Sequence, residues 1–258
     1  IPTWDSGFPV DFRFHRTPGT SVDWYTGARL MGGGKWLATN SSNAEANIAG
    51  TPDDSNEGFG TGHDSSWQAW MWKRHAGFDA VTYTGTGNNS NSGPNSTSQT
   101  IRHNLGRVPE MIWVKCRSIG YNWYVYHSGQ NGGTNPWNYY LQLNATDGEQ
   151  ESVAPYTNAM WNNTAPTSTQ FSLGPGNDIN DSGQTFVAYL FASVDGISKV
   201  GSYIGNGSAS GPTITLGFAP RFILIKCSSV GGTNWFVYDT LRGLTSGNDA
   251  RIYLDLTN

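Results

Sequence analysis

The stretch Val108-Pro109-Glu110-Met111-Ile112-Trp113-Val114-Lys115-Cys116 decides the fold, because it returns later in the chain as Ala219-Pro220-Arg221-Phe222-Ile223-Leu224-Ile225-Lys226-Cys227. The match extends to two further segments of each copy. Trp123-Tyr124-Val125-Tyr126 pairs with Trp235-Phe236-Val237-Tyr238, and Tyr140-Leu141-Gln142-Leu143 pairs with Tyr253-Leu254-Asp255-Leu256. A repeat of this length indicates one structural unit used several times along the chain.

A more divergent first copy carries Phe12-Arg13-Phe14-His15-Arg16, Asp23-Trp24-Tyr25 and Lys35-Trp36-Leu37-Ala38 in place of these segments. Its closing segment, Trp67 to Trp72, corresponds to Phe186 to Phe191 of the second copy. The chain therefore divides into about two and a half copies: a divergent module at 1–77, a complete module at 78–196 and a truncated module at 197–258.

The segments indicate β-strands, since apolar residues alternate with others or run for four to eight residues between turn signals. The composition agrees, with 13% aromatic residues, only 13% charged residues and 33 glycines. We expect an all-β protein of tandem β-sandwich modules, jelly-roll-like in character, with minimal helix.

Within one strand, Ile112, Val114 and Cys116 share a face opposite Met111, Trp113 and Lys115. The lysine is expected to extend to solvent along an aromatic neighbour. Cys116 and its counterpart Cys227 are expected to be unpaired and buried, because equivalent positions of successive modules lie too far apart for a disulfide.

The third module has no counterpart of the closing segment. Its apolar face, with Ile223, Ile225 and Val237, is therefore expected to lack cover and to leave an unpaired strand edge. We expect an assembly contact near residues 200–258, made with copies of the same chain or with another subunit that adds a strand.

The formal net charge of −4, without any run of Lys or Arg, argues against nucleic acid as a partner. No segment approaches the roughly 20 apolar residues that span a bilayer, so membrane insertion is not expected. The first residues, Ile1-Pro2-Thr3-Trp4, do not form a signal peptide.

No catalytic residue stands out, so the chain is interpreted as not an enzyme. The five histidines lack the spacing of zinc ligands, and no pair of carboxylates is singled out for glycoside hydrolysis. Two loops could offer several oxygens to calcium, although Asx turns explain both without an ion. They contain Asp53, Asp54, Asn56 and Glu57, and Asp178, Asn180 and Asp181. No other cofactor is expected.

The aromatic residues are the best candidates for ligand or partner contact, since their faces stack on sugar rings and anchor protein partners. Trp24, Trp123 and Trp235 recur in every copy and are interpreted as framework. The aromatics of loops found in one copy only are the candidate contact residues, namely Tyr121, Trp137, Tyr139, Tyr156 and Trp161.

The string from His103 to Lys115, followed by Trp123-Tyr124-Val125-Tyr126-His127 and by Phe186 to Phe191, resembles a repeated module of tailed-bacteriophage virion proteins. Those proteins are tail fibre or tail-associated surface proteins of marine and temperate phages. The segment Gly201 to Gly207 is similar to the inter-module sequence of that family. The resemblance implies a virion surface role and supplies no catalytic residues.

The sequence therefore predicts a bacteriophage virion structural protein, a tail fibre, spike or capsid-surface appendage. Such a protein would be located on the virion surface and would support assembly and adhesion to the host surface. Its partners would be other virion proteins, copies of itself and a host surface glycan. Two alternatives stay open: a secreted lectin-like carbohydrate-binding module and a polysaccharide depolymerase.

Overall fold

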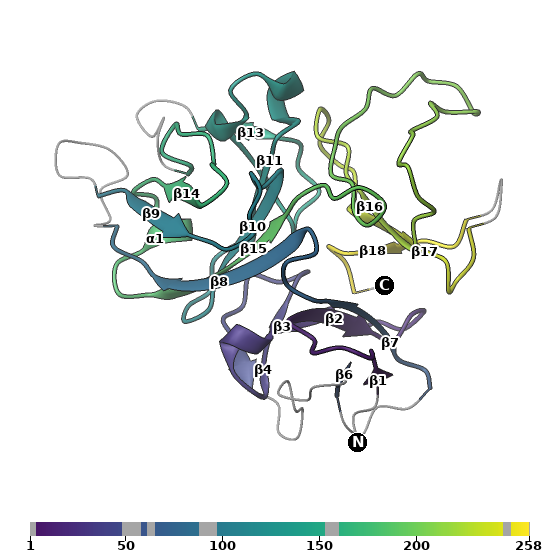
Figure 1. The fold of residues 1–258 in the computed structure, drawn as a ribbon, viewed down its shortest axis with the longest axis horizontal. Coiled ribbons are helices and arrows are strands. Elements are labelled where there is room, and N and C mark those ends of the chain that lie inside the picture. The colour runs from purple at the N-terminus through teal and green to yellow at the C-terminus, as the bar shows by residue number, and fades with distance from the viewer. Residues whose placement is uncertain are drawn as a thin grey trace.

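The computed structural model describes residues 4–47, 58–60, 65–87, 97–152, 160–244 and 249–257, and these form three main antiparallel sheets (Figure 1). Sheet I has the strand order β5-β4-β3-β2-β7, sheet II the order β13-β12-β11-β10-β15-β8, and sheet III the order β18-β17-β16. Two small pairs, β1-β6 and β9-β14, lie outside these sheets. The predicted all-β fold, with antiparallel sheets packed against each other, is confirmed.

The strands of sheet I are β2 (Phe12–Arg16), β3 (Tyr25–Ala28), β4 (Lys35–Ala38), β5 (Ala46–Asn47) and β7 (Gln68–Trp72). Those of sheet II are β8 (Phe78–Thr84), β10 (Met111–Cys116), β11 (Tyr124–His127), β12 (Tyr139–Gln142), β13 (Gln150–Glu151) and β15 (Thr185–Phe191). Sheet III contains β16 (Phe222–Ile225), β17 (Phe236–Asp239) and β18 (Ile252–Tyr253). The small pairs are β1 (Trp4–Asp5) with β6 (Gly58–Phe59), and β9 (Gln99–Arg102) with β14 (Gln170–Leu173).

Helix in the described part of the chain is confined to short turns, as the composition predicts. These are the four-residue α1 (Asn177–Asn180) and the 3-10 turns η1 (Arg29–Met31), η2 (Gln130–Gly133) and η3 (Pro136–Asn138). The turns lie between strands and interrupt no sheet.

The three sheets repeat one strand order. Strands β2, β10 and β16 each pair antiparallel with the next strand along the chain, and that strand pairs with a third. The strands predicted at 109–116 and 219–226 are thus present as β10 and β16, in equivalent places. The residue limits assigned to the three modules stay a prediction.

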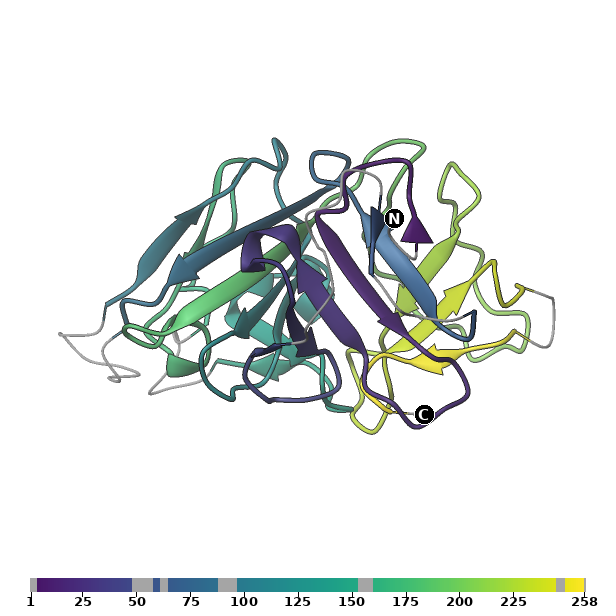
Figure 2. The ribbon, with the colours of Figure 1, turned by 90° about the horizontal axis from the view of Figure 1, so that it is seen from below.

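A single apolar core lies between the three sheets, and it follows from the alternation of side chains along the strands. In β10, Trp113 faces this core while Ile112 and Val114 face outward into a second cluster. The inner residues of β2, β16 and β17 belong to the same central core. Figure 2 shows sheet I in front, with sheet II on the left and sheet III on the right.

The recurring tryptophans connect the three sheets in a cycle. Each is buried, and each donates its indole N–H to a backbone carbonyl on the third strand of another sheet. The bonds run from Trp24 to Tyr253 (2.6 Å), from Trp123 to Ala38 (2.8 Å) and from Trp235 to Gln142 (3.0 Å). Sheet I therefore contacts sheet III, sheet III contacts sheet II, and sheet II contacts sheet I. The framework role predicted for these tryptophans is confirmed.

A second cycle consists of the basic residues within one position of the end of each first strand. Their side chains donate to backbone carbonyls on the segment that follows the third strand of another sheet. These bonds join Arg16 to Thr257 (2.7 Å), Lys115 to Ser42 (3.1 Å) and Lys226 to Thr146 (3.0 Å). The expectation that the lysine reaches solvent was wrong for Lys115, which is 0% exposed. The carbonyls of a neighbouring repeat provide the polar partners that water would otherwise supply.

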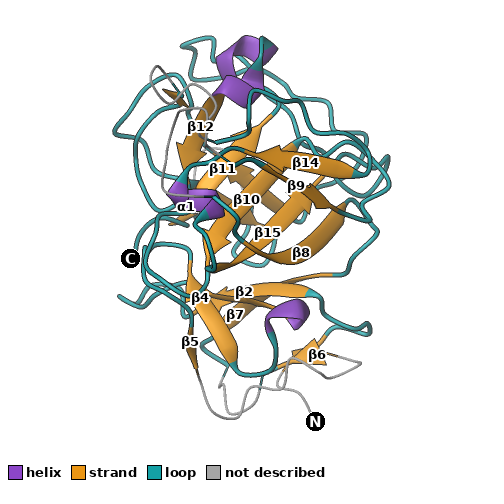
Figure 3. Ribbon diagram, turned by 90° about the vertical axis from the view of Figure 1, so that its left-hand side faces the viewer, coloured by secondary structure: helices purple, strands orange, loops and turns teal. Residues whose placement is uncertain are grey.

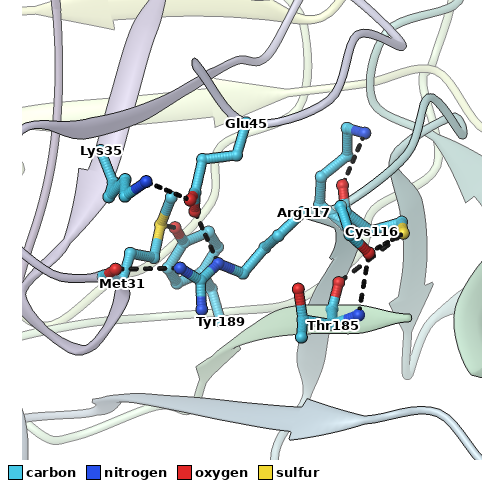
Figure 4. A network of polar contacts seen from close by, with 9 residues as sticks. Met31, Lys35, Glu45, Cys116, Arg117, Thr185 and Tyr189 are labelled. Carbon is cyan, nitrogen blue, oxygen red and sulfur yellow. Dashed lines mark hydrogen bonds and ion pairs between the residues drawn. The ribbon is translucent and has the colours of Figure 1, made fainter. Parts of the chain in front are cut away.

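Charged contacts also join sheets I and II (Figure 4). Arg117 donates to the Glu45 carboxylate at 2.6 Å and to the carbonyl of Met31 at 2.9 Å. The backbone N–H of Glu45 donates in return to the carbonyl of Arg117 at 2.7 Å. Lys35 lies 3.6 Å from the same carboxylate. This network fixes the edge at which the first two sheets meet.

Sheet II carries an additional layer on its outer face. Figure 3 shows β9, β14 and α1 lying across β10, β15 and β8. Ile101, Phe171 and Ile179 of this layer share a buried cluster with Ile112 and Val114 of β10. The second repeat is therefore closed on both faces, whereas the corresponding layer has no counterpart among the described residues of the third repeat.

Candidate functional site

The third repeat presents an open sheet edge. In sheet I the first strand, β2, lies between β3 and β7, and in sheet II the first strand, β10, lies between β11 and β15. In sheet III the equivalent strand, β16, pairs with β17 alone among the residues that the structure describes. Such an edge is a template for another strand.

The backbone groups at this edge are identified by the register. The N–H of Thr240 donates to the carbonyl of Arg221, as Ser128 does to Glu110 in sheet II. Because hydrogen-bonding positions alternate along an antiparallel strand, Ile223 and Ile225 bond β17, while Phe222 and Leu224 direct their N–H and C=O groups to the open edge. Phe222 and Leu224 thus each offer one N–H and one C=O group for pairing with an added strand.

The outer face of sheet III carries an apolar and aromatic patch, which we name the outer patch. Its members are half-buried: Ile223, Ile225, Phe236, Tyr238 and Tyr253. The counterparts of the first four in sheet II, Ile112, Val114, Tyr124 and Tyr126, are all buried beneath the additional layer. The outer patch is therefore the part of the repeat that lacks this cover.

Arg251 lies over the outer patch. Its guanidinium carbon is 5.4 Å from the ring centre of Phe236 and 5.9 Å from that of Tyr253. Its Nε donates to the Tyr253 hydroxyl at 3.2 Å, and this interaction is the main reason that the pKa of Arg251 is raised. A cation over aromatic faces gives the patch a positive charge at its border.

The segment before β16 adds further exposed apolar side chains. In sheet II the strand β8 pairs with β15 along its whole length, and its first residue, Phe78, is 1% exposed. Its counterpart Ile197 is 57% exposed, and Ile204 is 91% exposed. Residues 197–221 form no strand and extend as the long green loop of Figure 1.

Two expectations about the third repeat need correction. Val237 does not share a face with Ile223 and Ile225, because it lies opposite Leu224 and is buried in the central core. Cys227 is unpaired, as expected, but it is exposed, whereas Cys116 is unpaired and buried. The thiol of Cys116 lies 3.6 Å from the carbonyl of Thr185 in β15, whereas the described residues of the third repeat include no such strand to cover Cys227.

The different exposure of Cys116 and Cys227 predicts different reactivity of their thiols. Ellman's reagent should titrate one cysteine in the native chain, Cys227, and two after denaturation without reductant. Replacing Cys227 with serine should remove the native signal, while replacing Cys116 with serine should leave it in place. Equal reactivity of both thiols in the native chain would contradict the placement of Cys116 beneath β15.

The single-copy aromatic residues occupy several places. Trp137 is half-buried in the turn η3, and Tyr139 is half-buried at the start of β12. Trp161 donates its indole N–H to the carbonyl of Tyr139 at 2.9 Å. Trp161 itself is 3% exposed, which favours a structural role. Tyr121 lies apart, between β10 and β11, and donates to the Asp181 carboxylate at 3.1 Å. Tyr156 lies outside the described residues, and a contact role for the others stays a prediction.

The calcium hypothesis concerned two loops. Asp53, Asp54, Asn56 and Glu57 lie outside the described residues. In the other loop, the side chain of Asn180 accepts the N–H of Thr86 and donates to the carbonyl of Gly174, so it is occupied by protein partners. Burial raises the pKa of Asp178, although a hydrogen bond from Tyr124 opposes this shift. The described residues contain no group of three or more His, Cys, Asp or Glu side chains placed to hold a metal.

The three cations that join the repeats, of which Lys226 is only half-buried, have structural partners. Burial lowers the pKa of Lys115 to about 8, lowers that of Lys226 against the attraction of Asp255, and lowers that of Arg16. Perturbed groups of this kind often mark reactive sites, but here each one donates to backbone carbonyls of another repeat. Their arrangement supports packing between repeats.

Sequence reasoning did not find the outer patch as a unit. Tyr253 and Phe236 recur between copies and therefore looked like framework. The available signal was the additional layer: the third copy has no counterpart of Gln170–Leu173, a strand of the layer that buries the equivalent side chains in sheet II. Comparing which strands each copy lacks would have singled out these side chains.

The fold and this surface define an all-β domain of three interlocked sheets with one sheet left open. The chain belongs to the family described as a domain of unknown function, DUF7483, whose model matches residues 20–255. No match was found among curated proteins or among solved structures. Within the described ranges, no helix is both long enough and apolar enough to cross a membrane.

Proposed function

We propose that this chain is a structural component of a bacteriophage virion surface, a tail fibre, spike or capsid-surface appendage. It acts as a rigid support in an assembly and presents its loops to the host surface. The proposal takes its class from the resemblance of the repeated strands to a module of tailed-phage virion proteins.

The observation that carries the proposal is that the polar groups turned toward the core are used to join the repeats. Arg16, Lys115 and Lys226 hold one repeat to another through backbone carbonyls. The three buried tryptophans do the same. Side chains that are devoted to packing between repeats favour a scaffold over a reactive centre, and the open third sheet supplies a surface for assembly.

The direct test is the composition of particles. Virions purified by density gradient from the source of the sequence should contain the chain by mass spectrometry, at a constant ratio to the major capsid protein. Antibodies against the chain should bind intact particles at one structural location in electron micrographs. Absence from purified particles, with the chain found only free in the lysate, would overturn the proposal.

The two alternatives give different results. A secreted lectin-like module would bind on a glycan array and would be absent from particles. A depolymerase would release reducing ends from the cognate polysaccharide. Adhesion by a virion protein would combine glycan binding with presence in the particle, and the single-copy aromatics Trp137 and Tyr139 are the side chains to test for it.

A further inference from the structure

We infer that sheet III is completed by a strand from outside residues 1–258, which pairs with β16 and carries aromatic residues opposite Phe222 and Leu224. The inference concerns the kind of partner and holds whether or not that partner belongs to a virion. It follows from comparing the three repeats within this one chain.

The pattern of the missing strand is given by the two closing strands that are present. In sheet I, Phe12 lies opposite Trp72 and Phe14 lies opposite Trp70. In sheet II, Met111 lies opposite Phe191 and Trp113 opposite Tyr189. The two inner positions are aromatic in both cases. The residues opposite Phe222 and Leu224 are therefore expected to form an aromatic-x-aromatic sequence.

A third cycle of contacts supports this pattern. Phe12 of sheet I lies 4.4 Å from Tyr189 of the sheet II closing strand, measured between ring centres. Phe222 of sheet III lies 5.4 Å from Trp72 of the sheet I closing strand. The remaining member, Met111 of sheet II, would contact the closing strand of sheet III. Met111 is only half-buried, whereas Phe12 is almost fully buried.

The same strand would cover the segment before β16. In sheet II, Tyr83 of β8 stacks on Phe186 of the closing strand, with 5.1 Å between ring centres. Its counterpart Tyr203 is 49% exposed. One added strand next to β16 would thus do three things. It would pair with the open backbone edge of β16, complete the cover of Met111, and cover the exposed residues around Tyr203.

Residues 1–258 do not supply this strand. Their two closing strands, β7 and β15, are already built into sheets I and II, and β15 is paired on both sides. The stretches of sequence outside the described ranges contain no two aromatic residues two positions apart. A second copy could donate such a strand from its own residues 1–258 only by dismantling one of its sheets.

A synthetic peptide with the sequence of residues 66–74 tests the inference, because it contains the β7 strand and ends in Lys73 and Arg74, which help to keep it soluble. Labelled with fluorescein, it should bind the full chain saturably in anisotropy measurements. Binding should also slow the reaction of Cys227 with Ellman's reagent, in proportion to the fraction bound.

Matched control peptides separate strand pairing from nonspecific adhesion. N-methylation at Trp70 and Trp72 removes the two amide protons that would face β16, while N-methylation at Ala69 and Met71 alters the opposite edge. Only the first modification should abolish binding. On the protein side, Leu224→Pro removes an open-edge donor and Leu224→Ala keeps it, so binding should be lost in the first variant alone.

Three results would overturn the inference. The first is equal binding of both methylated peptides. The second is the absence of binding by the unmodified peptide, with Cys227 reactivity unchanged. The third is concentration-dependent dimerisation in light scattering that protects Cys227 without peptide, because it would identify a second copy as the occupant. None of these results depends on whether the chain is found in virions.

Discussion

Replacing Trp123 with alanine should lower the free energy of unfolding by about 4 kcal/mol, within the range found for buried tryptophans. The side chain is fully buried in the core shared by the three sheets. Its indole N–H donates to the carbonyl of Ala38 at 2.8 Å, so the substitution leaves both a cavity and a buried acceptor without its donor. Urea denaturation followed by circular dichroism measures the effect.

Two further variants separate the contribution of the lost apolar volume from that of the lost hydrogen bond. Trp123→Phe keeps most of the apolar volume but removes the hydrogen bond to Ala38, and it should cost roughly 1–2 kcal/mol. Trp137→Ala removes a half-buried tryptophan from the turn η3, which precedes β12 of sheet II, and should cost less than the substitution at Trp123. Equal losses for Trp123→Ala and Trp137→Ala would contradict a core shared by the three repeats.

Stability should increase as the pH is raised from 7 to 9.5. Burial lowers the pKa of Lys115 to about 8, whereas the pKa of a lysine in the unfolded chain is near 10.4. Between these values the unfolded chain binds more protons than the folded chain, so the free energy of unfolding rises with pH. At about 1.4 kcal/mol per pH unit, the gain from Lys115 by pH 9.5 is roughly 2 kcal/mol. Urea denaturation at a series of pH values measures it.

The variant Lys115→Met isolates this contribution. This variant should remove most of the increase in the free energy of unfolding with pH. A smaller increase should remain from Lys226, whose pKa is also lowered by burial. Burial raises the pKa of Tyr121 and of Tyr126 to about 12, so tyrosine ionisation acts in the opposite direction only above about pH 10. An unchanged slope in Lys115→Met would show that Lys115 is not buried as a charged group.

Much of the fold could be predicted from local pattern. The alternation of Met111, Ile112, Trp113 and Val114 correctly assigned the two faces of β10, because each face meets a different apolar cluster. Recurrence in every copy correctly identified Trp123 as framework. Both inferences depend on neighbours along the strand or on self-comparison, which a single sequence contains.

The features that could not be predicted are the burial of particular side chains, because this burial depends on contacts between segments far apart in the sequence. The burial of Lys115 requires the carbonyl of Ser42, a residue of another repeat that no local pattern associates with it. The different exposure of Cys116 and Cys227 depends on a strand that covers one and not the other. Trp161 looked like a loop residue, but an indole bond to Tyr139 and the second cluster bury it.

The cyclic arrangement has a consequence for the order in which the chain can fold. Arg16 and Trp24, near the start of the chain, bond the carbonyls of Thr257 and Tyr253 near its end. Contacts between residues so far apart in sequence give a high contact order, which is associated with slow folding. During synthesis on the ribosome, the first sheet can form its local hairpins early. Its inner face and the buried guanidinium of Arg16 must then wait until Tyr253 and Thr257 have been synthesised before these partners exist.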